Sequence, residues 1–166
     1  MLNLMNQMDK RRLVIVGAGM AGSKLAHDLR QAYGHLYQIT LIGEEPKVGY
    51  NRIMLSSLLA NDISHADMSL VDVQQMQQDG VHILSNDPVT SMDLETKMLQ
   101  LASGQTIAYD QLVLATGSRA SVLPIKGASA PNAMGFRTWQ DVDVMTQLKG
   151  SQPICVIGGG LLGLEA

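Results

Sequence analysis

Residues 13–22 read Leu-Val-Ile-Val-Gly-Ala-Gly-Met-Ala-Gly, a short apolar run followed directly by a G-x-G-x-x-G pattern. An apolar run that is bounded by glycine is typical of a parallel strand covered on both faces. Apolar side chains then recur with helical spacing over residues 21–32. A strand, a glycine turn and a helix in this order predict the first βα unit of a dinucleotide-binding fold.

Each glycine of the turn has its own physical role in such a unit. Gly17 permits the tight turn, Gly19 lets the backbone approach a pyrophosphate, and Gly22 lets the helix pack closely on the sheet. The N–H groups at the start of the helix face the phosphates, and the helix dipole favours their negative charge. We therefore expect a diphosphate to be held by Gly17, Ala18, Gly19, Met20, Ala21 and Gly22.

Two acidic residues follow a second strand that we expect at Gln38–Ile42. In this type of fold a carboxylate near the end of the second strand accepts hydrogen bonds from the ribose hydroxyls. Glu44 lies 22 residues after Gly22, a spacing that fits this role, and Glu45 is the second candidate. The alternative is that both glutamates belong only to a solvated turn.

The middle of the chain alternates helical and strand signals. We expect short helices at Leu55–Ala60 and Ser69–Gln78, the second ended by Gly80 in the left-handed conformation. Buried strands are expected at Val81–Leu84 and Leu112–Ala115.

Three short strands with turn signals between them predict an antiparallel meander over residues 86–108: Val89–Met92, Met98–Leu101 and Gln105–Ile107. The expected fold is therefore α/β and Rossmann-like, with helices on both faces of a parallel sheet and a β-meander added to it.

The end of the chain repeats the first signal. After a Pro-, Gly- and Ser-rich linker at Pro124–Pro131 and a helix at Asp141–Leu148, a strand is expected at Ile154–Ile157. Residues 158–163 then read Gly-Gly-Gly-Leu-Leu-Gly, which predicts a second dinucleotide turn built on Gly158, Gly160 and Gly163.

Composition narrows the class of protein. Hydrophobic residues make up 46% of the 166 residues and the net charge is −3, which indicates a globular core and no basic surface for nucleic acid. No segment has the length of a signal peptide core or membrane span, so a cytoplasmic protein is expected. Cys155, the single cysteine, is expected to be buried, and the four histidines lack metal-ligand spacing. No catalytic residue and no metal ligand is predicted.

Together, residues 14–22, 115–117 and 158–165 resemble the pyridine nucleotide-disulfide oxidoreductase superfamily. A finer resemblance runs over residues 44–57, which are similar to the corresponding loop of NAD(P)H-dependent nitrite reductase large subunits; ferredoxin and rubredoxin reductases share much of it. The superfamily resemblance implies that the first turn binds FAD and the second binds NAD(P)H. The resemblance runs over nearly all of residues 11–166 and implies the first part of a FAD-binding domain at 11–123, followed by the linker and the truncated start of an NAD(P)H-binding domain at 124–166. Residues 1–10, before it, are expected to form a flexible tail.

The resemblance also implies roles for residues outside the glycine turns. Arg52 is expected at the flavin or the pyrophosphate, where a guanidinium suits phosphate oxygens. Val89 is expected against the adenine through its backbone, and Ala115, Thr116 and Gly117 beside the flavin. Ser57 occupies the position where the ferredoxin-reductase relatives often carry a flavin-contacting lysine, which favours the nitrite reductase branch.

The implied activity is hydride transfer from a nicotinamide to a flavin, followed by electron transfer to a metal centre. The region near the flavin lacks the reactive cysteine pair of disulfide-reducing members, so the electrons would pass to a redox partner domain or protein. Iron–sulfur and sirohaem groups would be bound outside these residues. Two alternatives are left open: a rubredoxin or ferredoxin reductase, and a non-catalytic fragment that binds FAD or ADP. The sequence does not decide whether the protein forms a homo-oligomer.

Overall fold

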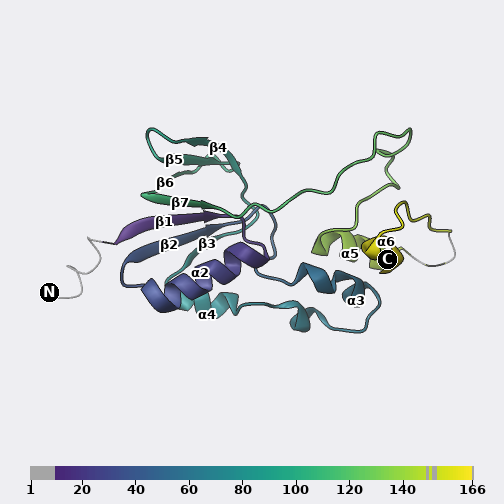
Figure 1. Ribbon diagram of the computed structural model, residues 1–166, viewed down its shortest axis with the longest axis horizontal. Helices are drawn as coiled ribbons and strands as arrows, with labels where there is room; N and C mark the ends of the chain where they lie inside the picture. The colour runs from purple at the N-terminus through teal and green to yellow at the C-terminus, as the bar shows by residue number, and fades with distance from the viewer. Residues whose placement is uncertain (1–9, 149, 151–152, 166) are drawn as a thin grey trace. The chain divides into compact units, whose positions relative to one another are not determined.

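Four parallel strands form the sheet that carries the first glycine turn in the computed structural model, which describes residues 10–148, 150 and 153–165. Their order is β3-β2-β1-β7, with β1 (Arg11–Val16) next to both β2 (Tyr37–Ile42) and β7 (Gln111–Leu114), and β3 (His82–Leu84) beyond β2 (Figure 1). The apolar run at residues 13–16 of β1 is buried on both faces, which explains why it lacks the alternation of a half-exposed strand. In β2, Ile39, Leu41 and Ile42 are buried, whereas Gln38 is exposed and Thr40 is half-buried.

Helices α2 (Met20–Tyr33) and α4 (Val73–Gln78) cover one face of this sheet (Figure 1). Side chains of successive residues in a strand point to opposite faces. The set on the helix side, together with the helix residues that pack on it, forms one buried cluster that includes Leu13, Ile15, Ile39, Leu41, Ala26 and Met76. The predicted strands at residues 13–16 and 38–42 and the helix at 21–32 are confirmed.

The opposite face of the parallel sheet is covered by a second sheet. Strands β4 (Val89–Asp93), β5 (Met98–Leu101) and β6 (Thr106–Ala108) pair antiparallel in the order β4-β5-β6. Leu99 and Leu101 of β5 pack in one cluster with Val14 and Val16 of β1. The predicted meander is therefore confirmed, but the prediction of helices on both faces is wrong. The apolar side chains of β5 already bury the face that a helix would have covered.

Residues Asn51–Ser69, together with the described residues from Ser118 on, form a separate compact unit. Its elements are η1 (Arg52–Met54), α3 (Leu55–Leu59), η2 (His65–Met68), α5 (Trp139–Thr146) and α6 (Leu161–Glu165). Trp139 and Val142 of α5 are buried, and the Trp139 ring stacks on His65 with 4.7 Å between ring centroids.

The start of α5 is fixed by a capping box, in which the Thr138 hydroxyl accepts from the Asp141 N–H at 3.2 Å and the Asp141 carboxylate accepts from the Thr138 N–H at 2.7 Å. The helix thus begins at Trp139, two residues before the position that the sequence predicts.

Helix α4 starts later than the sequence predicts. The carboxylate of Asp72 accepts the N–H of Gln75 at 2.9 Å, so Asp72 is the N-cap and the helix begins at Val73. The predicted helix over Ser69–Asp72 is wrong, because Leu70 donates its N–H to Gly49 at 2.8 Å instead. Gly80 has φ +94°, which confirms the left-handed conformation predicted after this helix.

The segment Ile154–Ile157 is not a strand, which corrects a further prediction. A segment with strand propensity forms a strand only where a neighbouring strand supplies hydrogen bonds. None of the described residues pairs with this segment. Cys155 is consequently exposed, and its predicted burial is also wrong. The tail predicted at residues 1–10 lies outside the described residues except for Lys10, whose ammonium donates to the Gly34 carbonyl at 2.8 Å. Among the described helices, none is both long enough and apolar enough to span a bilayer.

Candidate dinucleotide-binding site

The four parallel strands end level with one another. In the strand register Val16 is the partner of both Ile42 and Leu114, and Ile42 is the partner of Leu84. The residue after each of three strands continues the ladder by one bond, at 2.7–2.8 Å: Gly17 donates to Ile42, Gly43 to Leu84 and Ala115 to Val16. Ligands of open parallel sheets bind outside the carboxyl ends of the strands, so this edge is where a ligand is expected.

Positions 17 and 22 require glycine at this edge, because other backbone atoms lie too close to leave room for a Cβ atom. Gly17 has φ +111°, and a Cβ atom there would overlap the carbonyl oxygen of Ala115 and lie 2.8 Å from the Thr116 nitrogen. A Cβ atom on Gly22 would overlap the carbonyl oxygen of Gly17. The turn therefore packs against Ala115 and Thr116, which follow β7, on one side and against the start of its own helix on the other.

The amino end of α2 has no side-chain cap. Its N-cap residue is Gly19, and no acidic residue lies in the first turn. Helices α4 and α5, in contrast, are capped by Asp72 and by the Thr138–Asp141 capping box. An α-helix leaves its first N–H groups without an intrahelical acceptor, and these groups attract anions. The start of α2 therefore fits a phosphate group, because no carboxylate of its first turn competes for that position.

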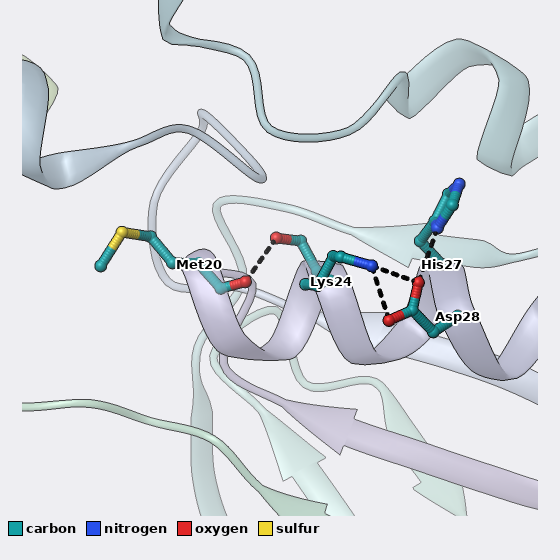
Figure 2. A network of polar contacts seen from close by, with 5 residues as sticks. Met20, Lys24, His27 and Asp28 are labelled. Carbon is teal, nitrogen blue, oxygen red and sulfur yellow. Dashed lines mark hydrogen bonds and ion pairs between the residues drawn. The ribbon is translucent and has the colours of Figure 1, made fainter.

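The buried Ser23 fixes the first turn of α2 from the inside. Its hydroxyl donates to the Gly19 carbonyl at 2.6 Å and lies 3.3 Å from the Met20 carbonyl oxygen. On the outer side of the helix, Lys24 donates to both carboxylate oxygens of Asp28, and His27 adds a contact at 3.1 Å (Figure 2). The Lys24 ammonium lowers the pKa of Asp28, with a smaller contribution from His27. Lys24 is thus paired along the helix, towards its carboxyl end.

The acidic loop, which we define as residues 43–50, contains both predicted ribose ligands. Glu44 is exposed, whereas Glu45 accepts a hydrogen bond of 2.6 Å from the hydroxyl of Tyr50. Both ends of the loop meet the glycine turn at Ala18. A Cβ atom on Gly43 would lie 2.7 Å from the Ala18 Cβ, and Gly49 donates its N–H to the Ala18 carbonyl at 3.0 Å. The glycine turn and the acidic loop are therefore in direct contact.

The other predicted FAD contacts divide between the two units. Ala115, Thr116 and Gly117 follow β7, and the first two lie against Gly17. Val89 begins β4 and packs beside the buried cluster of Val14, Val16 and Ile42. Arg52 and Ser57 belong to the second unit: Arg52 begins η1, which Asn51 caps at 3.1 Å, and Ser57 lies in α3. Both side chains are half-buried.

The second glycine turn repeats the local geometry of the first. Gly158 has φ +127°, and a Cβ atom on Gly163 would overlap the Gly158 carbonyl oxygen, as one on Gly22 would overlap that of Gly17. The first helical bond also recurs, from Leu164 N–H to the Gly160 carbonyl at 3.1 Å and from Ser23 N–H to the Gly19 carbonyl at 3.0 Å. The turn and the start of α6 thus form locally, without the preceding strand.

Four residues of this site were not predicted as site residues. Gly43 and Gly49 contact Ala18, Tyr50 binds Glu45, and Ser23 binds Gly19. The only signal for Gly49 in the sequence was a glycine in a loop, which has many explanations. Within the described part of the chain, no group of three or more His, Cys, Asp or Glu side chains is placed to hold a metal ion.

The sheet, the glycine turn and the acidic loop together define a dinucleotide-binding βαβ fold. The chain belongs to the pyridine nucleotide-disulphide oxidoreductase family, whose sequence model matches residues 11–166. This confirms the superfamily resemblance expected from the glycine turns.

Two relatives from Bacillus subtilis extend the match. The chain is 39% identical to a nitrite reductase [NAD(P)H] and 37% identical to an assimilatory nitrate reductase electron transfer subunit, in both cases over 96% of this chain. These alignments cover 20% and 21% of the two relatives, so the chain spans about a fifth of their length. The resemblance to nitrite reductases expected from residues 44–57 is therefore confirmed.

Solved structures agree with the architecture. Putidaredoxin reductase, in its covalent complex with putidaredoxin, superposes with a TM-score of 0.80 at 30% identity, covering 93% of this chain and 38% of that protein. The NADH:rubredoxin oxidoreductase of Clostridium acetobutylicum gives 0.81 at 27% identity, covering 94% and 40%. A water-forming NADH oxidase from Lactobacillus brevis superposes with a TM-score of 0.85 at 19% identity, covering 94% of this chain and 36% of that protein. At this identity the match shows a shared fold only.

Proposed function

We propose that this chain is the FAD-binding region of a FAD-dependent NAD(P)H oxidoreductase. The observation that carries the proposal is the contact between the glycine turn and the acidic loop at the carboxyl edge of the sheet, where Ala18 meets both Gly43 and Gly49. This arrangement offers an anion site and a nearby carboxylate, which are the two groups that a dinucleotide requires for its pyrophosphate and its ribose. Membership of the family supports the same assignment.

Each part of the edge has a role in this proposal. The backbone of residues 17–22 holds the pyrophosphate, and the exposed Glu44 accepts the ribose hydroxyls. The start of β4 at Val89 lies against the adenine, and residues 115–117 flank the flavin. The bound FAD would supply the chemistry, accepting a hydride and releasing electrons one at a time. The residues of the chain bind and orient the cofactor, and none of them is proposed as an acid or base.

Residues of the second unit complete the proposed machinery. We assign Arg52 to the pyrophosphate or the flavin, since its charge and planar shape suit phosphate oxygens. Ser57 is assigned to the same region. Gly158, Gly160 and Gly163 would hold the pyrophosphate of NAD(P)H, a role supported by the geometry that this turn shares with the first. In domain terms, we propose that the FAD-binding part extends to about residue 123 and that the NAD(P)H-binding part begins after the linker.

The particular oxidoreductase that we propose is a nitrite reductase large subunit that serves nitrate assimilation in the cytoplasm. The two Bacillus subtilis relatives support this, as does Ser57 in place of the lysine expected in ferredoxin reductases. Iron–sulfur and sirohaem groups would then belong to other parts of a longer protein. The match to putidaredoxin reductase supports a second candidate, a reductase of ferredoxin or rubredoxin. Several hundred further residues with clustered cysteines in the full reading frame would favour the first candidate over the second.

A binding experiment tests the proposal directly. The purified chain is titrated with FAD, ADP and FMN in a calorimeter. We expect FAD and ADP to bind and FMN, which lacks the adenosine half, to bind at least about tenfold more weakly, a difference of about 1.4 kcal/mol. Bleaching of bound flavin by NADH would show hydride transfer. Bound flavin without bleaching would support the third candidate, a fragment that binds FAD or ADP but does not turn over.

Gly19→Val is the matched variant for this titration. Gly19 is the N-cap residue of α2 and has φ −76°, which any residue can adopt, so a side chain can be added there without a strained backbone angle. We expect FAD affinity to fall at least about tenfold while the thermal midpoint stays near that of the control variant Ala32→Val, at an exposed position of the same helix. Unchanged FAD affinity in Gly19→Val would contradict the proposal.

A further inference from the structure

We propose that Tyr50 is a positioning residue for dinucleotide binding, because it holds Glu45 inside the acidic loop and leaves Glu44 as the carboxylate that binds ribose. This inference rests on the proposed function and deepens it: the sequence offers two adjacent glutamates, and the structure separates their roles.

The hydrogen bond between Tyr50 and Glu45 is the first observation. Tyr50 is buried, with 3% of its surface exposed, although its hydroxyl is a polar group. The hydroxyl reaches the Glu45 Oε2 at 2.6 Å, a length that is typical of an O–H donor on a carboxylate. A bond of this kind in a buried setting is stronger than one in water, and it fixes the direction of the Glu45 side chain.

The backbone on either side of Glu44 is held in place. The Gly43 carbonyl accepts the N–H of Asp87 at 3.1 Å, and the Glu45 carbonyl accepts the N–H of Asn86 at 3.1 Å. Both donors follow strand β3. Glu44 therefore lies between two anchored residues while its own side chain is exposed at the strand edge.

The far end of the acidic loop is anchored to the phosphate turn. Gly49 donates to Ala18 at 3.0 Å and accepts from Leu70 at 2.8 Å, and its φ of +65° allows the chain to turn there into the buried Tyr50. Gly49, which contacts the glycine turn, thus directly precedes Tyr50, which holds Glu45. Binding costs less ordering when ligand groups are already positioned, so these anchors set the backbone of Glu44 relative to the phosphate turn before the dinucleotide arrives.

The separation of roles has an electrostatic reason. Two carboxylates at one ribose would repel each other and compete for the same hydroxyls. The Tyr50 hydroxyl gives the Glu45 carboxylate a hydrogen-bond donor within the loop, whereas the Glu44 side chain is exposed. Loss of the hydroxyl would remove this bond and would loosen the loop that carries Glu44.

The experiment compares ADP with 2′-deoxy-ADP, since the ratio of their dissociation constants reports ribose recognition alone. We expect the unsubstituted chain to prefer ADP by at least about tenfold, and Glu44→Gln to abolish most of this preference. Tyr50→Phe should reduce the preference at least about threefold, and Glu45→Gln, which keeps an acceptor for Tyr50, should reduce it less than Glu44→Gln does. Affinity for inorganic pyrophosphate, which has no ribose, should change less than twofold in all three variants.

Tyr37→Phe is the control, because it removes another tyrosine hydroxyl from the amino end of β2, at the opposite edge of the sheet. It should leave the preference for ADP unchanged. If Tyr50→Phe leaves the preference for ADP unchanged, the inference is overturned while the proposed function stands. The same conclusion follows if Glu45→Gln and Glu44→Gln reduce the preference equally. If Tyr50→Phe does not fold, the comparison of the two glutamate variants decides. Failure of the unsubstituted chain to bind FAD or ADP overturns the proposed function and this inference together.

Discussion

Gly17 lies against the carbonyl oxygen of Ala115, in a position that leaves no room for a side chain at residue 17. The two residues follow neighbouring strands, and the sheet bond from the Ala115 N–H to Val16 holds them together at 2.7 Å. The turn proposed for the pyrophosphate and the segment proposed for the flavin therefore form one surface, fixed by the packing of β1 on β7.

Gly17→Ala should destabilise the chain strongly. The φ of +111° at Gly17 is costly for any residue with a Cβ atom, by roughly 1–2 kcal/mol, and the Cβ would in addition overlap Ala115. We expect a loss of at least about 3 kcal/mol in the free energy of unfolding, measured by urea denaturation.

Gly104→Ala separates the cost of a positive φ from the cost of the overlap with Ala115. Gly104 has φ +87°, but a Cβ atom there would meet nothing within 4 Å. It should cost only the backbone term of roughly 1–2 kcal/mol. Equal losses in the two variants would show that close approach to Ala115 adds nothing to the requirement for glycine.

The local features of the site could be read from the sequence because they depend on neighbouring residues. The glycine turn, the first two strands and the helix between them follow from residue spacing over residues 13–42, and their positions are confirmed. The left-handed Gly80 was predictable for the same reason, since a helix end and a glycine adjoin.

The features that the sequence did not reveal depend on residues far apart in the chain. Whether a helix or the β5 strand covers the second sheet face is decided by the packing of Leu99 and Leu101 on Val14 and Val16, which no local pattern encodes. The same is true of Ile154–Ile157, whose strand propensity is not realised among the described residues. The hydrogen bond from Tyr50 to Glu45 joins nearby residues, but its direction depends on the burial of Tyr50 in the folded loop.

Gly49 and Val71 should show energetic coupling. A Cβ atom on Gly49 would lie 2.5 Å from the Val71 Cγ2, and the φ of +65° adds a backbone cost. Val71→Ala removes the methyl group that causes this clash but does not change the backbone. The free energy of unfolding of the double variant Gly49→Ala/Val71→Ala should therefore be at least about 1 kcal/mol higher than the sum of the losses in the two single variants predicts. Strict additivity in urea denaturation would mean that Val71 moves aside freely.

The pairing of Arg12 with Asp110 should make stability depend on pH in the acid range. The guanidinium donates to both carboxylate oxygens, at 2.7 Å and 3.2 Å, and the Arg12 N–H adds a third bond at 2.7 Å. The Arg12 side-chain bonds are the largest cause that lowers the pKa of Asp110 from 3.8 to about 2. Because the pKa is lower in the folded chain, the stabilisation is present in full above pH 3.8 and is lost as the pH falls towards 2.

Asp110→Asn tests this dependence when its free energy of unfolding is compared with that of the unsubstituted chain across that pH window. The difference between the two should be largest above the ordinary pKa of Asp and should shrink on acidification. Both side chains are partly exposed, 48% for Arg12 and 39% for Asp110, so about 1 M salt should also reduce the difference. Arg12→Gln should raise the pKa of Asp110 towards its ordinary value in an NMR titration. A difference that stays constant with pH would mean that the pair does not favour the charged carboxylate of Asp110 in the folded chain.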